Sequence, residues 1–202
     1  MSIMIIYFKF KNIINCYIFL LPILVYSQVK PERNNVWAAK EYSKEIALYN
    51  SKNYLFKTVL GTTSEVTQFE VIPLAAASSG ELTTLLYKCE NKGKEGLVLG
   101  FYGNYWNDNG VLYQGFAFKN LEKDQAVEFL NKIQLAIEEN SRYLKDNKDY
   151  NNIFFSYMDV DVLIWSSTEG YTIRLFWNNF DSAWEKTAFE RSKRRFEKKI
   201  TN

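Results

Sequence analysis

Residues 97–119 read LVLGFYGNYWNDNGVLYQGFAFK, two runs of aliphatic and aromatic residues separated by a stretch that contains Asn109-Gly110. Asn-Gly favours a two-residue hairpin turn because both residues tolerate a positive φ angle. Such a turn pairs Trp106 with Tyr113, and side chains then alternate between two faces. The predicted core face carries Leu97, Leu99, Phe101, Tyr105, Leu112, Gln114, Phe116 and Phe118.

The reverse face of this hairpin is a candidate ligand-binding surface, with Tyr102, Asn104, Trp106 and Tyr113 as the candidate residues. Aromatic rings beside glycines suit stacking on a flat ligand such as a sugar ring, because the missing Cβ lets a ligand approach the backbone. A helix packed on this face explains the same residues, since sheets of this class commonly bury at least one face. Both interpretations remain open from the sequence.

The segments around the hairpin predict alternating blocks of helix and strand. One apolar stripe with helical spacing contains Val127, Leu130, Ile133, Ile137 and Leu144. A capping-box pattern, Ser182 to Glu185, indicates the start of the last helix. The expected elements are a helix at 36–50, strands at 66–74, 82–90, 97–106 and 111–119, a helix at 120–145, strands at 153–165 and 171–178, and a helix at 182–200.

This order predicts an α+β fold without βαβ alternation. The expected architecture is an antiparallel β-meander sheet of about four to six strands plus a C-terminal β-hairpin, packed with a long middle helix and a C-terminal helix. We expect a single domain at residues 36–202, preceded by an exposed lead-in at 28–35.

Residues 1–27 have the pattern of a signal peptide. Lys9 and Lys11 precede an apolar core at 13–25, which is shorter than a membrane-spanning helix, and Ser27 is a small residue suited to cleavage. The alternative is a leader retained as an anchor. Either way, the pattern predicts export to the periplasm or the extracellular space.

Composition excludes several classes of function. The chain has 25 basic and 23 acidic residues, and the leader holds two of the lysines, which leaves 23 of each. A neutral domain lacks the positive field that non-specific nucleic-acid binding needs. The chain has no histidine, and Cys89 is the one cysteine after residue 27, so Ser-His-Asp and Cys-His pairs and His-ligated metal sites are excluded. We expect no cofactor and no metal.

Acidic residues of the second strand pair are weak candidates for catalysis. Asp159 and Asp161 are two apart and share a face of the predicted strand, and Glu169 follows in the expected loop. Paired carboxylates act as general acid and base in hydrolases of carbohydrate or wall polymer. A four-residue loop at 166–169 pairs Ile164 with Tyr171 and places Asp161 opposite Arg174, so a cross-strand ion pair is the simpler explanation.

The last helix is strongly basic. Residues 186–199 contain seven Lys or Arg residues and two Glu residues, and Arg191, Arg195 and Lys198 fall on one side. Cations near a helix C-terminus are stabilised by the helix dipole. The same patch also suits an acidic partner: phospholipid headgroups, an anionic wall polymer or a protein.

We therefore expect an exported, non-catalytic binding module for a glycan or an envelope partner. Two alternatives remain: a carboxylate-based hydrolase of carbohydrate or cell-wall polymer, and a subunit of an envelope protein assembly. No set of residues in the chain matches the catalytic motif of a known reaction, which favours binding over catalysis.

Overall fold

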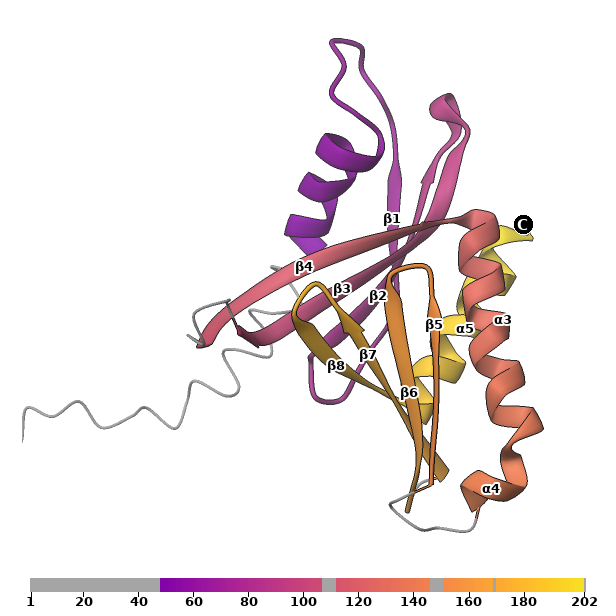
Figure 1. The fold of residues 1–202 in the computed structure, drawn as a ribbon. Coiled ribbons are helices and arrows are strands. Elements are labelled where there is room, and N and C mark those ends of the chain that lie inside the picture. Colours follow the sequence, from indigo (N-terminus) through magenta and orange to yellow (C-terminus); the bar gives the residue numbers. More distant parts are fainter. Residues whose placement is uncertain (1–47, 107–111, 146–150, 169, 202) are drawn as a thin grey trace, which may run out of the picture. The chain divides into compact units, whose positions relative to one another are not determined.

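The computed structural model describes residues 48–106, 112–145, 151–168 and 170–201, which belong to one compact unit at Lys40–Asn202. Figure 1 shows two β-sheets with helices beside them. Residues 48–54 are α-helical. The elements that follow are η1 (Leu55–Val59), β1 (Glu70–Ala76), β2 (Leu82–Cys89), η2 (Glu90–Lys92), β3 (Lys94–Trp106), β4 (Leu112–Glu122), α3 (Lys123–Glu139), α4 (Ser141–Lys145), β5 (Asn152–Tyr157), β6 (Val160–Ser167), β7 (Gly170–Trp177), β8 (Phe180–Glu185) and α5 (Lys186–Ile200).

Both sheets are four-stranded antiparallel meanders, β1-β2-β3-β4 and β5-β6-β7-β8. Each meander runs directly into a helix, β4 into α3 and β8 into α5, with Glu122 and Glu185 as the N-cap residues. The predicted α+β class, the first meander and a C-terminal helix are confirmed. The helix predicted at 120–145 is present as α3 and the short α4, which are separated at Asn140. The expected C-terminal hairpin is a full second sheet, so the chain repeats one order of elements without a visible sequence repeat.

Two short turns produce the additional strands of the second sheet. Met158 has a φ of 53° and lies in a turn inside the segment predicted as one strand at 153–165. The turn divides that segment into β5 and β6. Asn178 and Asn179 have φ angles of 50° and 63° and connect β7 to β8. Two consecutive positive φ values are typical of a type I′ hairpin turn, a conformation that Asn tolerates.

The last helix begins at Lys186, so the predicted start at Ser182 is wrong. Ser182 and Trp184 are buried strand residues of β8. The Ser182 hydroxyl donates to the Glu81 carbonyl at 3.1 Å instead of capping a helix. Pairing of β8 with β7 therefore overrides the local capping pattern.

The register of the β3–β4 hairpin also differs from the prediction. Trp106 pairs with Leu112, and Tyr113 pairs with Tyr105. The paired ends leave residues 107–111 between them, five residues in place of the expected two. A shift of one residue moves every side chain of a strand to the other face, so the predicted composition of both faces is wrong.

The main core lies between the two sheets and the helices. It contains the buried β3 residue Phe101, whose ring centroid lies 5.4 Å from that of Trp177 on β7. Trp184 on β8 meets Phe189 on α5 edge to face, with 5.0 Å between centroids. These contacts join strands and helices from both halves of the chain into one core.

A second, smaller core lies on the other face of the first sheet. Leu55 of the N-terminal helical segment packs there with Val98 and Phe118, and Tyr54 stacks on Phe118 at 5.5 Å between centroids. A Cβ on Gly100 would lie 3.2 Å from the Phe118 ring, so glycine lets this ring lie close to β3. A helix therefore covers this part of the reverse face.

Candidate functional site

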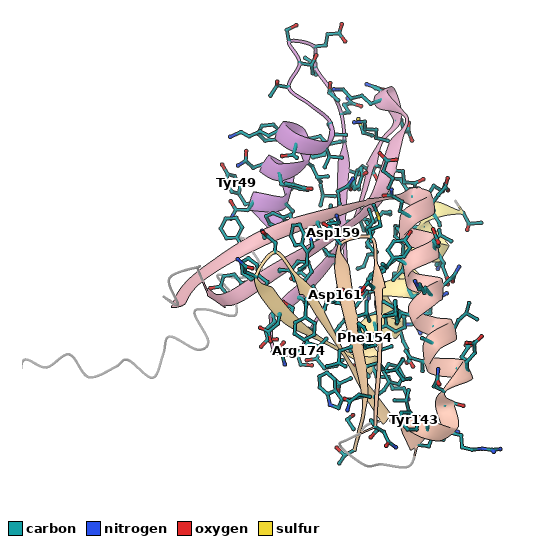
Figure 2. The ribbon with its side chains drawn as sticks, viewed as in Figure 1. Tyr49, Tyr143, Phe154, Asp159, Asp161 and Arg174 are labelled. Carbon is teal, nitrogen blue, oxygen red and sulfur yellow. The ribbon has the colours of Figure 1, made fainter. Side chains whose placement is uncertain are left out.

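The acidic residues proposed for catalysis have separate partners. Asp159 lies in the β5–β6 turn, where it accepts hydrogen bonds from Lys119 Nζ at 2.5 Å and Trp177 Nε1 at 2.9 Å. The hydrogen bond from Lys119 is the main reason that the pKa of Asp159 lies below its usual value. Asp161 on β6 accepts from the Ser156 hydroxyl at 2.5 Å. Figure 2 labels both aspartates. An ionised Asp159 bound to a lysine is not a general acid.

The predicted Asp161–Arg174 ion pair is also wrong. The β6–β7 ladder ends at Ser167 and Gly170, so Asp161 pairs with Phe176. This register differs by two residues from the prediction, which preserves the faces but changes the partners. Arg174 instead contacts Asp181 of β8 with both Nε and Nη2, each at 2.7 Å from Oδ2. The third candidate, Glu169, lies outside the described residues.

The aromatic candidates are described only in part. Tyr102 is half-buried and pairs directly with Phe116, which is 46% exposed. The side chains of Asn104, Trp106 and Tyr113 lie outside the described part of the chain. Stacking on a sugar ring therefore stays a prediction, and the register removes the expected pairing of Tyr113 with Trp106.

The basic patch borders a groove between α5 and β1. The groove has a volume of about 540 Å³. Two of the three residues predicted for the acidic-partner patch, Arg195 and Lys198, line it, whereas Arg191 is exposed on the same helix outside the lining. The full lining is Glu70, Ile72, Pro73, Leu74, Lys88, Arg195, Lys198 and Lys199.

A β-bulge shapes the floor of the groove. The ladder between β1 and β2 shifts between Pro73 and Ala75, which leaves Leu74 as the extra residue. The Leu74 carbonyl accepts a hydrogen bond from Arg195 Nη1. The Ala75 N–H donates to the Thr84 hydroxyl oxygen at 3.2 Å. The bulge is thus stabilised from both sides, and Arg195 is held against the floor.

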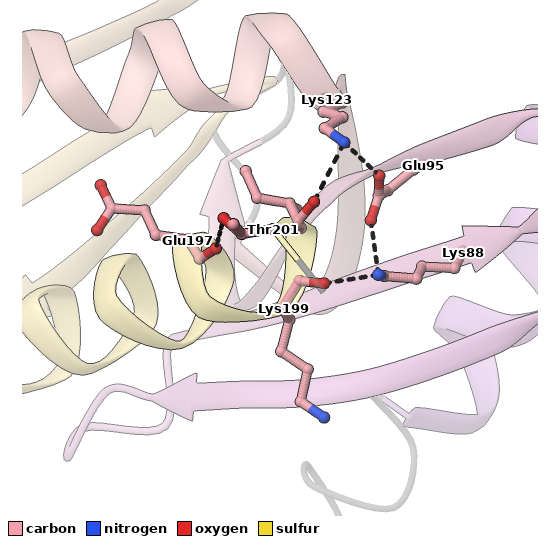
Figure 3. Close-up of polar contacts among 7 residues, drawn as sticks. Lys88, Glu95, Lys123, Glu197, Lys199 and Thr201 are labelled. Atoms are coloured by element: carbon pink, nitrogen blue, oxygen red, sulfur yellow. Dashed lines mark hydrogen bonds and ion pairs between the residues drawn. The ribbon is translucent and has the colours of Figure 1, made fainter.

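An ion-pair network fixes the end of α5 beside the groove (Figure 3). Lys88 donates to the Lys199 carbonyl at 2.6 Å and lies 3.0 Å from Glu95, while Lys123 lies 2.9 Å from Glu95 and 3.3 Å from the Ile200 carbonyl. Burial of Glu95 opposes its ionisation, but hydrogen bonds from Lys123 and Lys88 outweigh burial and lower its pKa. Two lysines therefore satisfy the last carbonyls of the helix.

The ammonium groups of Lys198 and Lys199 lie outside this ion-pair network. Both are exposed, and neither ammonium group has an ion pair among the described residues. The charge of Lys88 is paired with Glu95, so the groove combines the positioned guanidinium of Arg195 with two exposed lysines. Such an arrangement binds an anion by charge and hydrogen bonding. No cluster of three or more metal-ligating residues occurs in the described ranges.

Sequence reasoning missed Lys88, Lys199 and the apolar β1 wall. The available signal was Pro73 inside a strand, because proline is confined to edge strands and bulges. Within the described ranges, no helix is long and apolar enough to cross a membrane. In comparisons with known proteins, no protein-family model, curated protein or solved structure matches the chain.

Proposed function

We propose that the protein is an exported, non-catalytic binding module that holds an anionic ligand in the groove between α5 and β1. The observation that carries the proposal is the lining of that groove, which contains four cationic side chains and the carboxylate of Glu70. Lys88 is paired with Glu95, whereas Arg195, Lys198 and Lys199 have no ion pair among the described residues. Its volume of about 540 Å³ lies in the range of small-ligand sites.

Helix capping alone does not explain these cations. Lys88 and Lys123 already donate to the carbonyls of Lys199 and Ile200 at the end of α5. The ammonium groups of Lys198 and Lys199 are therefore not needed as donors to these carbonyls, although the helix dipole favours their charge. An anionic ligand gives them a role.

The two strongly raised phenol pKa values belong to structural contacts between the second sheet and the helices. Burial, and then the neighbouring Glu128, raise the pKa of Tyr157 to about 12, and its hydroxyl donates to Glu128 Oε2 at 2.9 Å. Burial, and then Glu190, likewise raise the pKa of Tyr171. Both phenols stay protonated near neutral pH, and each acts as a structural hydrogen-bond donor between a sheet and a helix.

Charge reversal in the groove tests the proposal, with immobilised heparin as the polyanion probe. We expect Lys198→Glu/Lys199→Glu to weaken heparin binding at least about tenfold at constant salt, because each basic residue near an anionic surface contributes roughly 1 kcal/mol. The matched control is Arg142→Glu/Lys145→Glu, which makes the same charge change at exposed positions of α4. Equal losses in the two variants contradict a specific site and indicate a response to net charge alone.

A further inference from the structure

We infer that the groove binds the headgroup region of an anionic phospholipid and thereby holds the protein on an acidic membrane surface. This inference rests on the proposed function, because it names the class of anion that the groove takes. Three features of the groove support it: an apolar wall, access from solvent, and cations that lie on one side of α5.

The β1 wall of the groove is apolar although the α5 wall is cationic. Ile72 and Pro73 supply the apolar side chains, whereas Leu74 is 1% exposed and contributes only its backbone. An inorganic anion or a simple polyanion gains nothing from such a wall. A phospholipid has its phosphate directly beside glycerol and the first methylenes, so charge and apolar surface are both matched.

The groove is an open surface depression formed by β1, Lys88 of β2 and the side of α5. A free fatty acid needs a cavity that encloses most of its surface. A phospholipid in a bilayer needs no such enclosure, since its chains stay in the membrane. The open form therefore favours a lipid in a bilayer over a free amphiphile.

Pairing of an acidic peptide as an added strand is disfavoured along β1. Pro73 has no N–H to donate, and the Leu74 carbonyl is occupied by Arg195. Addition of a strand relies on free backbone groups of this kind. The groove thus presents side chains and not a strand edge to its ligand.

Exposed cations extend the positive surface beyond the groove along α5. Arg191, Arg195 and Lys198 are spaced by four and three residues and therefore lie on one side of the helix. The buried residues Ser192 and Phe196 face the core. A one-sided row of this kind attracts an acidic surface over about a Debye length.

Vesicle sedimentation tests the inference with phosphatidylcholine vesicles made with and without phosphatidylglycerol. We expect the protein to bind only vesicles that contain phosphatidylglycerol, and Lys198→Glu/Lys199→Glu to lose at least about tenfold in affinity. Ile72→Ser and, separately, Pro73→Ser remove apolar surface from the β1 wall. Each is expected to weaken vesicle binding several-fold and heparin retention by clearly less, and an unchanged circular-dichroism spectrum shows that the variant is folded.

Two controls complete the experiment. Phe154→Ser replaces an exposed apolar residue of β5 on the second sheet and is expected to leave both vesicle and heparin binding unchanged. Glycerol phosphate serves as a soluble competitor that has the headgroup chemistry without the chains. We expect it to displace the protein from vesicles only at concentrations far above those of the lipid.

The possible results separate the two proposals. If heparin binds through the groove but phosphatidylglycerol vesicles do not bind, the lipid inference is overturned and the proposed function stands. The inference is also overturned if Ile72→Ser and Pro73→Ser leave vesicle binding unchanged. It is overturned as well if glycerol phosphate abolishes vesicle binding at a concentration similar to that of the lipid. If neither heparin nor vesicle binding depends on Lys198 and Lys199, both proposals are wrong.

Discussion

Phe101→Ala is expected to lower the free energy of unfolding by about 3–5 kcal/mol, as truncation of a buried phenylalanine typically does. Phe101 is 0% exposed on β3, and its ring contacts Trp177 on β7. The substitution therefore leaves a cavity between the two sheets, where the β3 and β7 side chains meet. Urea denaturation of parent and variant measures the difference.

The control for this experiment is the same substitution at an exposed site. Phe154 on β5 is 74% exposed, so Phe154→Ala is expected to change the free energy of unfolding by less than about 0.5 kcal/mol. Similar losses for the two variants contradict a shared core between the sheets.

Thr84→Val is expected to cost about 2–3 kcal/mol although the two side chains have nearly the same shape, because it leaves buried polar groups without partners. Thr84 and Ser192 are each 1% exposed, and their hydroxyl oxygens lie 2.7 Å apart between β2 and α5. Thr84 also accepts from the Ala75 N–H in the β1 bulge. Loss of this hydroxyl therefore loosens both the bulge and the contact with α5.

Thr83→Val provides the matched control on the same strand. Thr83 is half-buried, so its replacement is expected to cost less than about 1 kcal/mol in urea denaturation. A double-mutant cycle with Ser192→Ala isolates the coupling of Thr84 to α5. A Thr84→Val loss no larger than that of Thr83→Val contradicts the assigned role of the hydroxyl.

Periodicity predicted the elements because it reports directly which side of an element is buried. Leu130, Ile133 and Ile137 of the predicted stripe are buried on α3. The first four strands were found for the same reason, with boundaries that differ by a few residues. Turns shorter than the window of a pattern were missed, which is why the strand predicted at 153–165 divides at Met158.

Register was harder to predict where both faces of a strand are buried. Phe101 contacts the main core and Val98 contacts the second core, so apolar side chains suit either face of β3. A register shifted by one residue then fits the hydrophobic pattern almost as well as the correct one. The Asn109-Gly110 dipeptide was the remaining signal, and it indicated the wrong pairing. In the second hairpin, one face is far more exposed, and there the predicted faces are correct although the partners differ by two residues.

Only some of the residues of the candidate site could be predicted from the sequence. Arg195 and Lys198 were found because helical spacing places them on one side of α5. Their partners on β1 are far away along the chain: Leu74, which receives the Arg195 hydrogen bond, is 121 residues distant. Only the packing of α5 against β1 brings the cations and the apolar wall together.

Ligand contacts in the groove between α5 and β1 will change the environment of the backbone amides that form its walls. The most direct measurement is a map of backbone amide chemical shifts in the purified protein during titration with bicelles that contain phosphatidylglycerol. We expect shifts concentrated at residues 70–72, Leu74, Lys88 and residues 195–199, which line the groove or lie within its walls. Shifts concentrated around Phe154 and Arg174 on the second sheet, with the groove unchanged, contradict binding in the groove.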